Sequence, residues 1–487
     1  MRRGVRWRQA GRGDNSPRTC RRVRGAAMWL ATCALVAFIP LPAAAQDAIV
    51  GPAADDSDDP VLAFAREASD LEELRAAVLS AIERSGSLGE ARAARDEAEA
   101  RRNEVRTQET PTLELGVSSF RVISRDFSND PQNFLERSRP SKRTDATLRA
   151  SQLLFDFGAT VQRIEAANAR IEVAIAQIDD TANQTALRAV SVQSDVHGRR
   201  TLVQLGSAFI ASLYDLRAKM VERVDEGVSS EVDLAQVDGY IAQAEAQQAD
   251  FERGLAAAEA AYFELVGTPA PPGLGRPPVP FVLAGSVTAE GGQTAALLDT
   301  LPQVRAASAG LRAAEREAKA ARADILPKVT LSVDAGRYDI IESTRDYDIR
   351  ATVNLNFRLF GGEKQRADQA EARQAGAQAR LDRLRDEALR NARIAATDVA
   401  ALEKAEAAVR MSYLSSRRAK GAVFERFQVA RAALLDVLVA ESNYFDVATR
   451  YLQTVTELDV ARYVFLARTG SLQDALGIDS AMIADTP

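Results

Sequence analysis

The sequence predicts an α+β membrane protein that combines long α-helices with amphipathic β-strands and is built from an internal duplication. Landmarks of the first half recur in the second half, each 203 residues later: Phe157-Gly158 and Phe360-Gly361, Gln162-Arg163 and Gln365-Arg366, Ala169-Arg170 and Ala372-Arg373, Asp233 and Asp436, Gly267 and Gly470. Landmarks that keep one order without an insertion indicate a structural repeat. A stretch without proline over residues 159–224 and an alternating strand over residues 347–360 are the two other signs of this fold.

Residues 1–45 are typical of a secretory signal. Arginines dominate residues 2–24, an apolar run follows over residues 26–41, and three alanines at 43–45 offer a cleavage site. Both cysteines, Cys20 and Cys33, lie inside this segment, so we expect no disulfide in the mature chain. Because the apolar run continues beyond Cys33, we do not expect a lipid anchor there.

The composition excludes nucleic acid as a partner. The chain carries 62 basic and 68 acidic residues, and loss of the arginine-rich signal would make its net charge of -6 more negative. Nucleic-acid binders instead concentrate basic residues on one surface. The aspartate-rich residues 46–70 are predicted to form a disordered acidic leader.

The first repeat is predicted to span residues 71–268. Its elements follow from apolar periodicity and from the glycines and prolines that interrupt it. We expect a helix over 71–108, strands over 112–122 and 145–157, and helices over 159–224 and 230–265 joined by a turn at 225–229. At 1.5 Å per residue, the longest of these helices would reach about 100 Å.

The second repeat is predicted to span residues 297–476, after a linker rich in proline and glycine over residues 269–296. Its expected elements are a helix over 297–325, strands over 328–338 and 347–360, helices over 362–416 and 434–468, and a C-terminal tail over 477–487. Each repeat would therefore supply one β-hairpin and one long helical hairpin.

The strand over residues 347–360 alternates strictly between apolar and polar side chains. One face would carry Tyr347, Ile349, Ala351, Val353, Leu355, Phe357 and Leu359, and the other Asp348, Arg350, Thr352, Asn354, Asn356 and Arg358. A strand with one face in lipid and one in water requires this pattern. A strand of a soluble β-sandwich is the alternative.

The helix over residues 434–468 carries two apolar stripes. One runs in steps of three and four from Val437 to Phe465, and the other runs from Leu434 to Val455. Each stripe resembles a coiled-coil seam, so the helix is expected to have a neighbour on both sides. A helical barrel and an ordinary antiparallel bundle both satisfy this pattern, and the attached strands favour the barrel.

Four motifs carry a family resemblance. QLLFDFG (152–158) and NFRLFGG (356–362), which hold Phe157, Gly158, Phe360 and Gly361, resemble the strand-to-helix junctions of the TolC family of outer-membrane export channels. GVSSEVDLAQVDGYIAQAE (227–245) and FQVARAALLDVLVAESNYF (427–445) resemble that family's helical-hairpin tips. The resemblance implies a homotrimer in the outer membrane, with one twelve-stranded β-barrel, four strands per chain, continued by a periplasmic coiled-coil helical barrel.

The same resemblance implies a gate at the hairpin tips. Asp233 and Asp436 match acids of that gate, Phe427 stands where a tyrosine is usual, and Arg431 is displaced by one position from the usual arginine. A second acid of the family's ring is replaced by Val439.

Capping is the alternative role for Asp233, because Ser230 precedes it at the spacing of a capping box. Asp436 has Ala433 at that position, so capping does not explain it. The tips near Gly227 and Ala430 are expected to contact a periplasmic adaptor.

The resemblance implies passive conduction through an exit duct. It also implies a periplasmic adaptor and an inner-membrane transporter of the ABC or proton-driven type as partners, and the junction motif resembles type I secretion channels, whose cargo is protein. Small-molecule efflux with a proton-driven pump and a soluble periplasmic coiled-coil adaptor are the alternatives. We expect no enzyme activity, no metal and no cofactor, and we expect the single histidine, His197, to be a solvated surface residue.

Overall fold

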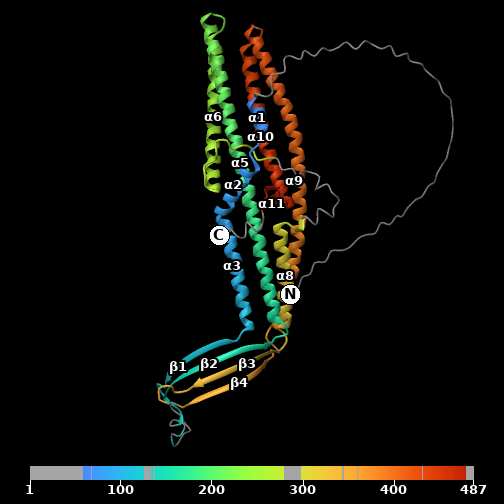
Figure 1. Cartoon of the computed structure of the whole chain (residues 1–487). Helices are drawn as coiled ribbons and strands as arrows, with labels where there is room; N and C mark the ends of the chain where they lie inside the picture. Colours follow the sequence, from blue (N-terminus) through green and yellow to red (C-terminus); the bar gives the residue numbers. More distant parts are fainter. Residues whose placement is uncertain are drawn as a thin grey trace, which may run out of the picture. The chain divides into compact units, whose positions relative to one another are not determined.

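The computed structural model describes residues 59–66, 68–125, 132, 134, 138–278, 298–342, 345–358, 360–429 and 431–478. All of them belong to one compact unit, Asp55–Pro487. The signal over 1–45, the leader as far as residue 58, residues 279–296 of the linker and residues 479–487 of the tail lie outside the described residues. The elements are α1 (Pro60–Arg66), α2 (Leu71–Arg84), α3 (Gly86–Arg106), η1 (Thr107–Glu109), β1 (Thr112–Arg121), β2 (Lys142–Phe155), α5 (Ala159–Asp225), α6 (Glu231–Val266), α8 (Pro302–Ala323), β3 (Lys328–Arg337), β4 (Tyr347–Asn356), α9 (Glu363–Gln428), α10 (Leu434–Thr469) and α11 (Leu472–Leu476) (Figure 1).

The four strands form one antiparallel sheet in the order β1-β2-β3-β4. The two predicted hairpins are its halves, and the pairing of β2 with β3 joins them. The register keeps apolar and polar side chains on separate faces. One transverse row joins Leu115, Leu148, Ala335 and Ile349, and the next row joins Glu114, Arg149, Asp334 and Arg350. The side chains of Leu115 and Ile349 are 76% and 66% exposed, so the apolar face of the sheet is uncovered in the described part of the chain.

A β-bulge adapts the end of β2 to the helix that follows. The register shifts between Leu153 and Phe155, which places Phe155 opposite Val329 on the apolar face. Phe157 then takes a left-handed φ of 56° and Gly158 one of 83°, and α5 begins at the next residue. A residue with a side chain is strained at a positive φ, whereas glycine is not. The left-handed φ therefore explains why position 158 holds glycine.

The two junctions differ by one residue. In the second repeat the left-handed residue before the helix is Gly362, with φ 82°, rather than the Gly361 that matches Gly158 in the sequence. Phe360 is fully exposed and is not among the residues with a positive φ. The predicted equivalence of the junction residues is therefore corrected by one position in the second repeat.

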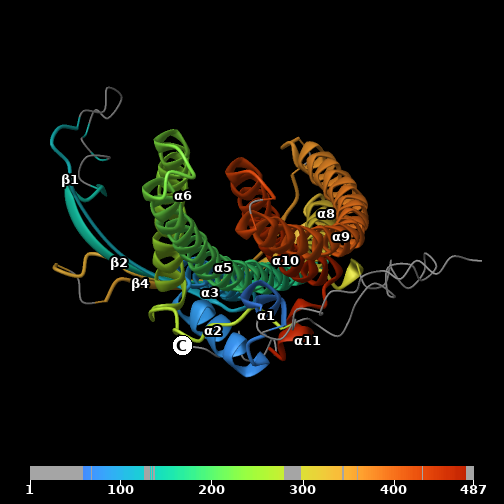
Figure 2. The same cartoon turned by 90° about the horizontal axis from the view of Figure 1, so that it is seen from above.

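The helices pair in the order that the stripes predict. α10 packs against both α9 and α5, which confirms two neighbours for this helix, and α5 also packs against α6. Closer to the sheet, α8 takes the place of α10 between α5 and α9, and α3 lies on the other side of α5. Viewed along the helices, α6, α5, α10 and α9 follow one curve (Figure 2). Within the described residues, no helix combines the length and the apolar composition needed to cross a bilayer.

Two expectations are wrong. The acidic leader was expected to be disordered as far as residue 70, but from Asp59 the chain is folded: α1 follows, and Asp59 is only 3% exposed. His197 is not a solvated residue, because it is 8% exposed, stacks on Phe64 and lies 2.8 Å through Nδ1 from the carbonyl oxygen of Leu274. Both errors share one cause, which is that α1 covers this part of α5 and no local pattern indicates that contact.

Candidate functional site

The tip of the first helical hairpin is closed by backbone bonds and one capping box. The N–H groups of Val228 and Ser229 donate to the carbonyl oxygen of Arg223, and Gly227 supplies the left-handed φ of 72° that the turn needs. Asp233 Oδ2 accepts from the N–H of Ser230 at 3.0 Å, and the hydroxyl oxygen of Ser230 accepts from the N–H of Asp233 at 3.3 Å. The predicted capping box is present, and the backbone N–H of Ser230 lowers the pKa of Asp233.

The tip of the second hairpin is closed differently. Ala433 offers no side-chain acceptor, but Asp436 Oδ2 accepts from the N–H of Ala433 at 3.0 Å. Asp436 therefore does cap the start of α10, and the expectation that capping cannot explain this acid is corrected. The N–H of Arg431 donates to the carbonyl oxygen of Arg426, while Ala430 lies outside the described residues.

Phe427 joins the two hairpins. Its ring is 5% exposed, and the guanidinium carbon of Arg223 at the end of α5 lies 4.8 Å from the ring centre. Closer to the sheet, the ammonium of Lys219 lies 4.6 Å from the ring centre of Phe424. Such contacts contribute about 0.5 to 2 kcal/mol each, depending on burial. The hydroxyl that a tyrosine would supply is absent at Phe427, and a cation on α5 holds the ring instead.

The other predicted gate residues are exposed and do not meet in one chain. Arg431 and Asp436 are exposed at the second tip, and Asp233 is half-buried at the first. Among the described residues Arg431 forms no ion pair with either acid. The geometry thus brings together Arg223 and Phe427, of which only Phe427 was singled out from the sequence. A cation and an aromatic ring on helices about 200 residues apart leave no local signal.

Large apolar side chains are exposed at both tips. Val228 and Val232 of the first tip are 61% and 67% exposed, and Val429, Leu435 and Val439 of the second are 63%, 53% and 54% exposed. Exposed apolar groups gathered at one end of a molecule mark a surface for a protein partner.

A stripe of mostly small residues follows the exposed side of α6. The stripe advances in steps of three and four and consists of Val232, Ala235, Gly239, Ala242, Ala246, Ala249, Arg253, Ala256, Ala260 and Phe263. A second exposed stripe follows α9 with a repeat of seven residues: Ile394, Ala401, Ala408, Ser415 and Ala422. Both stripes have the spacing of a coiled-coil seam, and small residues let two helices approach closely.

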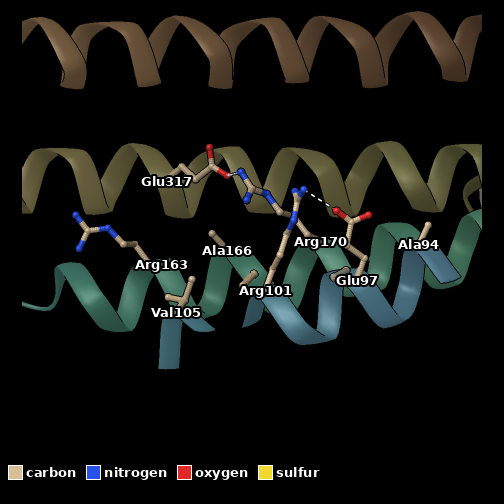
Figure 3. Close-up of a pocket in the computed structure, with 10 residues that line it drawn as sticks. Ala94, Glu97, Arg101, Val105, Arg163, Ala166, Arg170 and Glu317 are labelled. Carbon is tan, nitrogen blue, oxygen red and sulfur yellow. Dashed lines mark hydrogen bonds and ion pairs between the residues drawn. The ribbon is translucent and has the colours of Figure 1, made fainter. Parts of the chain in front are cut away.

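A groove of about 340 Å³ lies between α3, α5 and α8 (Figure 3). Three arginines line it, and each has a carboxylate partner: Arg101 with Glu97 at 2.7 Å, Arg170 with Glu317, and Arg163 with Asp324. All three arginines that line the groove are therefore ion-paired. Within the described residues no cluster of His, Cys, Asp and Glu could hold a metal ion.

A family model described as "Outer membrane efflux protein" matches residues 78–268 and 295–463. The chain is 25% identical over 346 residues to the outer membrane efflux protein BepC of Brucella suis biovar 1 (strain 1330). The aligned residues make up 69% of this chain and 74% of BepC. It is 33% identical over 138 residues to the solvent efflux pump outer membrane protein SrpC of Pseudomonas putida. This alignment covers 28% of this chain and 29% of SrpC.

Solved structures share the fold. CusC superposes with a TM-score of 0.70 at 19% identity, over 84% of this chain and 92% of CusC. The outer membrane protein VceC of Vibrio cholerae superposes with a TM-score of 0.69 at 20% identity, over 83% of this chain and 96% of VceC.

Proposed function

The chain belongs to the outer membrane efflux protein family, and from this premise we propose that it is the exit duct of a tripartite export system. The duct would be a homotrimer in the outer membrane, with a twelve-stranded β-barrel continued into the periplasm by a barrel of helices. It would conduct cargo passively, so an inner-membrane ABC or proton-driven transporter would supply the energy through a periplasmic adaptor. The family assignment sets aside a soluble coiled-coil adaptor.

The open edges of the fold are the observation that carries this proposal. β1 and β4 are the edges of the sheet, and α6 and α9 lie at the two ends of the curve of helices (Figure 2). An unpaired strand edge cannot remain in lipid, because its N–H and C=O groups would have no partners. We infer that β4 of one copy pairs with β1 of the next, and that three copies of four strands close the ring.

The helical stripes support the same arrangement. The small residues of α6 and the heptad of α9 lie on opposite ends of the curve and repeat with one period. Seams of matching period pack against each other, as knobs fit into holes. We infer that α6 of one copy packs against α9 of the next.

The faces of the sheet suit the two environments that a barrel needs. The apolar face with Leu115 and Ile349 would meet lipid, and the polar row with Glu114, Arg149 and Asp334 would line the water-filled exit. At the other end of the duct, the hairpin tips with Asp233, Asp436, Arg431 and Phe427 would close it. The tips near Gly227 and Ala430, with the exposed valines beside them, would meet the adaptor.

The cargo is either unfolded protein or small molecules. The LLFDFGAT junction supports type I protein secretion, which is our first proposal. The name of SrpC describes a solvent efflux pump protein, and this relationship favours small-molecule export as the second candidate. Deletion of the gene should abolish one exported protein in the first case and sensitise cells to organic solvents in the second.

Fractionation tests the duct. We expect the protein to stay in outer membranes washed with alkaline carbonate and to leave them in detergent as a particle of about three chains. Release as a soluble periplasmic protein would refute the membrane barrel. Extraction as a monomer would refute the shared ring.

A further inference from the structure

The N-terminal strap, which we define as residues 59–66, lies over the place where three long helices meet. Val61, Leu62 and Phe64 are each at most 3% exposed. They share one apolar cluster with residues of α5, α9 and α10: Leu202, Leu205, Tyr413, Phe445, Ala448, Tyr451, Leu452 and Val455. Figure 2 shows α1 beside α5 and α10 on the outer side of the curve. The strap therefore bridges the first helical hairpin and the second.

A buried carboxylate fastens the first end of the strap to α9. Asp59 Oδ2 accepts from the Tyr413 hydroxyl at 2.6 Å and lies 3.0 Å from Nη1 of Arg417. Asp59 Oδ1 accepts from the N–H of Val61 at 2.9 Å, so the same side chain also starts α1. One carboxylate thus holds two elements that are far apart in the sequence.

A second fastening joins the other end of the strap to α10. Arg276 donates to the carbonyl oxygen of Ala65 and, through Nε, to Asp459 Oδ2 of α10 at 2.7 Å. The carbonyl oxygen of Arg276 accepts from the N–H of Ser69 at 2.9 Å. The strap is therefore tied to α9 at one end and to α10 at the other.

We expect the strap to detach at a lower free energy than the helices beneath it unfold. An isolated helix of seven residues is unstable in water, so docking alone holds α1 in place. α5, α9 and α10 have 67, 66 and 36 residues and pack against one another along their lengths. Short segments with few contacts open locally at a lower free energy than the long elements they cover.

We propose that the strap is a latch that holds the α9–α10 hairpin against α5 and must release when the two hairpins separate to open the duct. The inference rests on the proposed duct function and adds a control element outside the hairpin tips. Opening would separate the strap from α5, where Phe64 stacks on His197 and the strap packs against Leu202 and Leu205. Asp59 and Arg276 would keep the strap on α9 and α10.

Single-channel recording of the full-length protein in planar bilayers tests the latch. Phe64→Leu keeps an apolar side chain but removes the ring that stacks on His197 of α5, and we expect it to raise the open probability about fivefold, as the loss of an aromatic pair implies. Phe134→Leu is the matched control, because it makes the same change at an exposed position between β1 and β2. The control should record as the wild type does.

The other ring of the stack provides a second variant. Should Phe64→Leu fail to assemble, His197→Gln removes the ring on α5 and should still raise the open probability. A variant that melts earlier but opens like the wild type would overturn the latch. A wild-type protein that forms no channel would instead refute the duct.

Discussion

The guanidinium of Arg223 lies 4.8 Å from the ring centre of Phe427, so the last turn of α5 meets the last turn of α9 through a cation–π contact. The first of these helices belongs to the first repeat and the second to the second repeat. The contact needs only the ring of Phe427 and the guanidinium of Arg223. We therefore expect closure of the duct at its tips to use the aromatic ring of Phe427 and not the hydroxyl group of a tyrosine.

Replacement of Phe427 tests this contact. Phe427→Leu keeps an apolar side chain but removes the ring, and a loss of about 1 kcal/mol would raise the open probability about fivefold. Phe427→Tyr keeps the ring and should behave like the wild type. Single-channel recording distinguishes the two variants, and equal behaviour of the leucine and tyrosine variants would contradict the cation–π account.

Asp436 should influence the ions that pass the tip. It is exposed, and the N–H of Ala433 is its hydrogen-bond partner among the described residues, so its charge is open to the solvent. We expect Asp436→Asn to weaken cation selectivity and block by divalent cations. Asp233→Asn is the comparison, because the capping box holds that side chain against Ser230. Single-channel currents at several calcium concentrations provide the measurement, and unchanged currents in the Asp436 variant would exclude its role at the gate.

The seam between copies should not accept a large side chain. Ala246 lies in the middle of the exposed α6 stripe, and Ala246→Leu would push the facing helix away. We expect the trimer extracted in detergent to dissociate at a lower temperature or to be replaced by monomer. Gln243→Leu places the same side chain on an exposed position of α6 outside the stripe and should leave the trimer intact. A stable trimer with leucine at 246 would show that this stripe is not the seam.

The elements of the fold could be predicted because their signals are local and repeated. Strand alternation, proline-free stretches and the two stripes of α10 each depend on neighbours within a few turns, and the structure has the four strands and both helical hairpins. α9 continues to Gln428, twelve residues beyond its expected end, because the sequence after Ser416 shows no clear stop. The junction shift from Gly361 to Gly362 was also missed, since both positions hold glycine and only the backbone distinguishes them.

The contacts between distant segments could not be predicted. Asp59 looked like part of a solvated acidic stretch, yet its partner Tyr413 is 354 residues away. His197 and Phe64 are likewise brought together only by the docking of α1. For the tips, the sequence predicted the capping box of Ser230 and Asp233 correctly, because capping is a local pattern. Arg223, the cation opposite Phe427, could be identified only from the structure.

Three buried tyrosines should make the protein sensitive to high pH. Burial raises the pKa of Tyr413, Tyr451 and Tyr463, and that of Tyr451 reaches about 12. The pKa of an unfolded tyrosine is about 10. Because each folded pKa lies above the unfolded one, the stabilisation is complete below pH 10 and is lost as pH rises toward the folded values. The loss is about 1.4 kcal/mol per pH unit for each tyrosine.

Thermal melting of the detergent-extracted protein between pH 8 and pH 11.5 measures this effect. We expect a constant melting temperature up to about pH 10, the unfolded tyrosine value, and a steep fall above it. Tyr451→Phe removes one of the three groups, so its melting temperature should fall less steeply with pH above pH 10 even if it is lower at pH 8. A variant with the wild-type slope would mean that Tyr451 ionises alike in the folded and unfolded chains, and the burial of its hydroxyl between α9 and α10 would then not persist in solution.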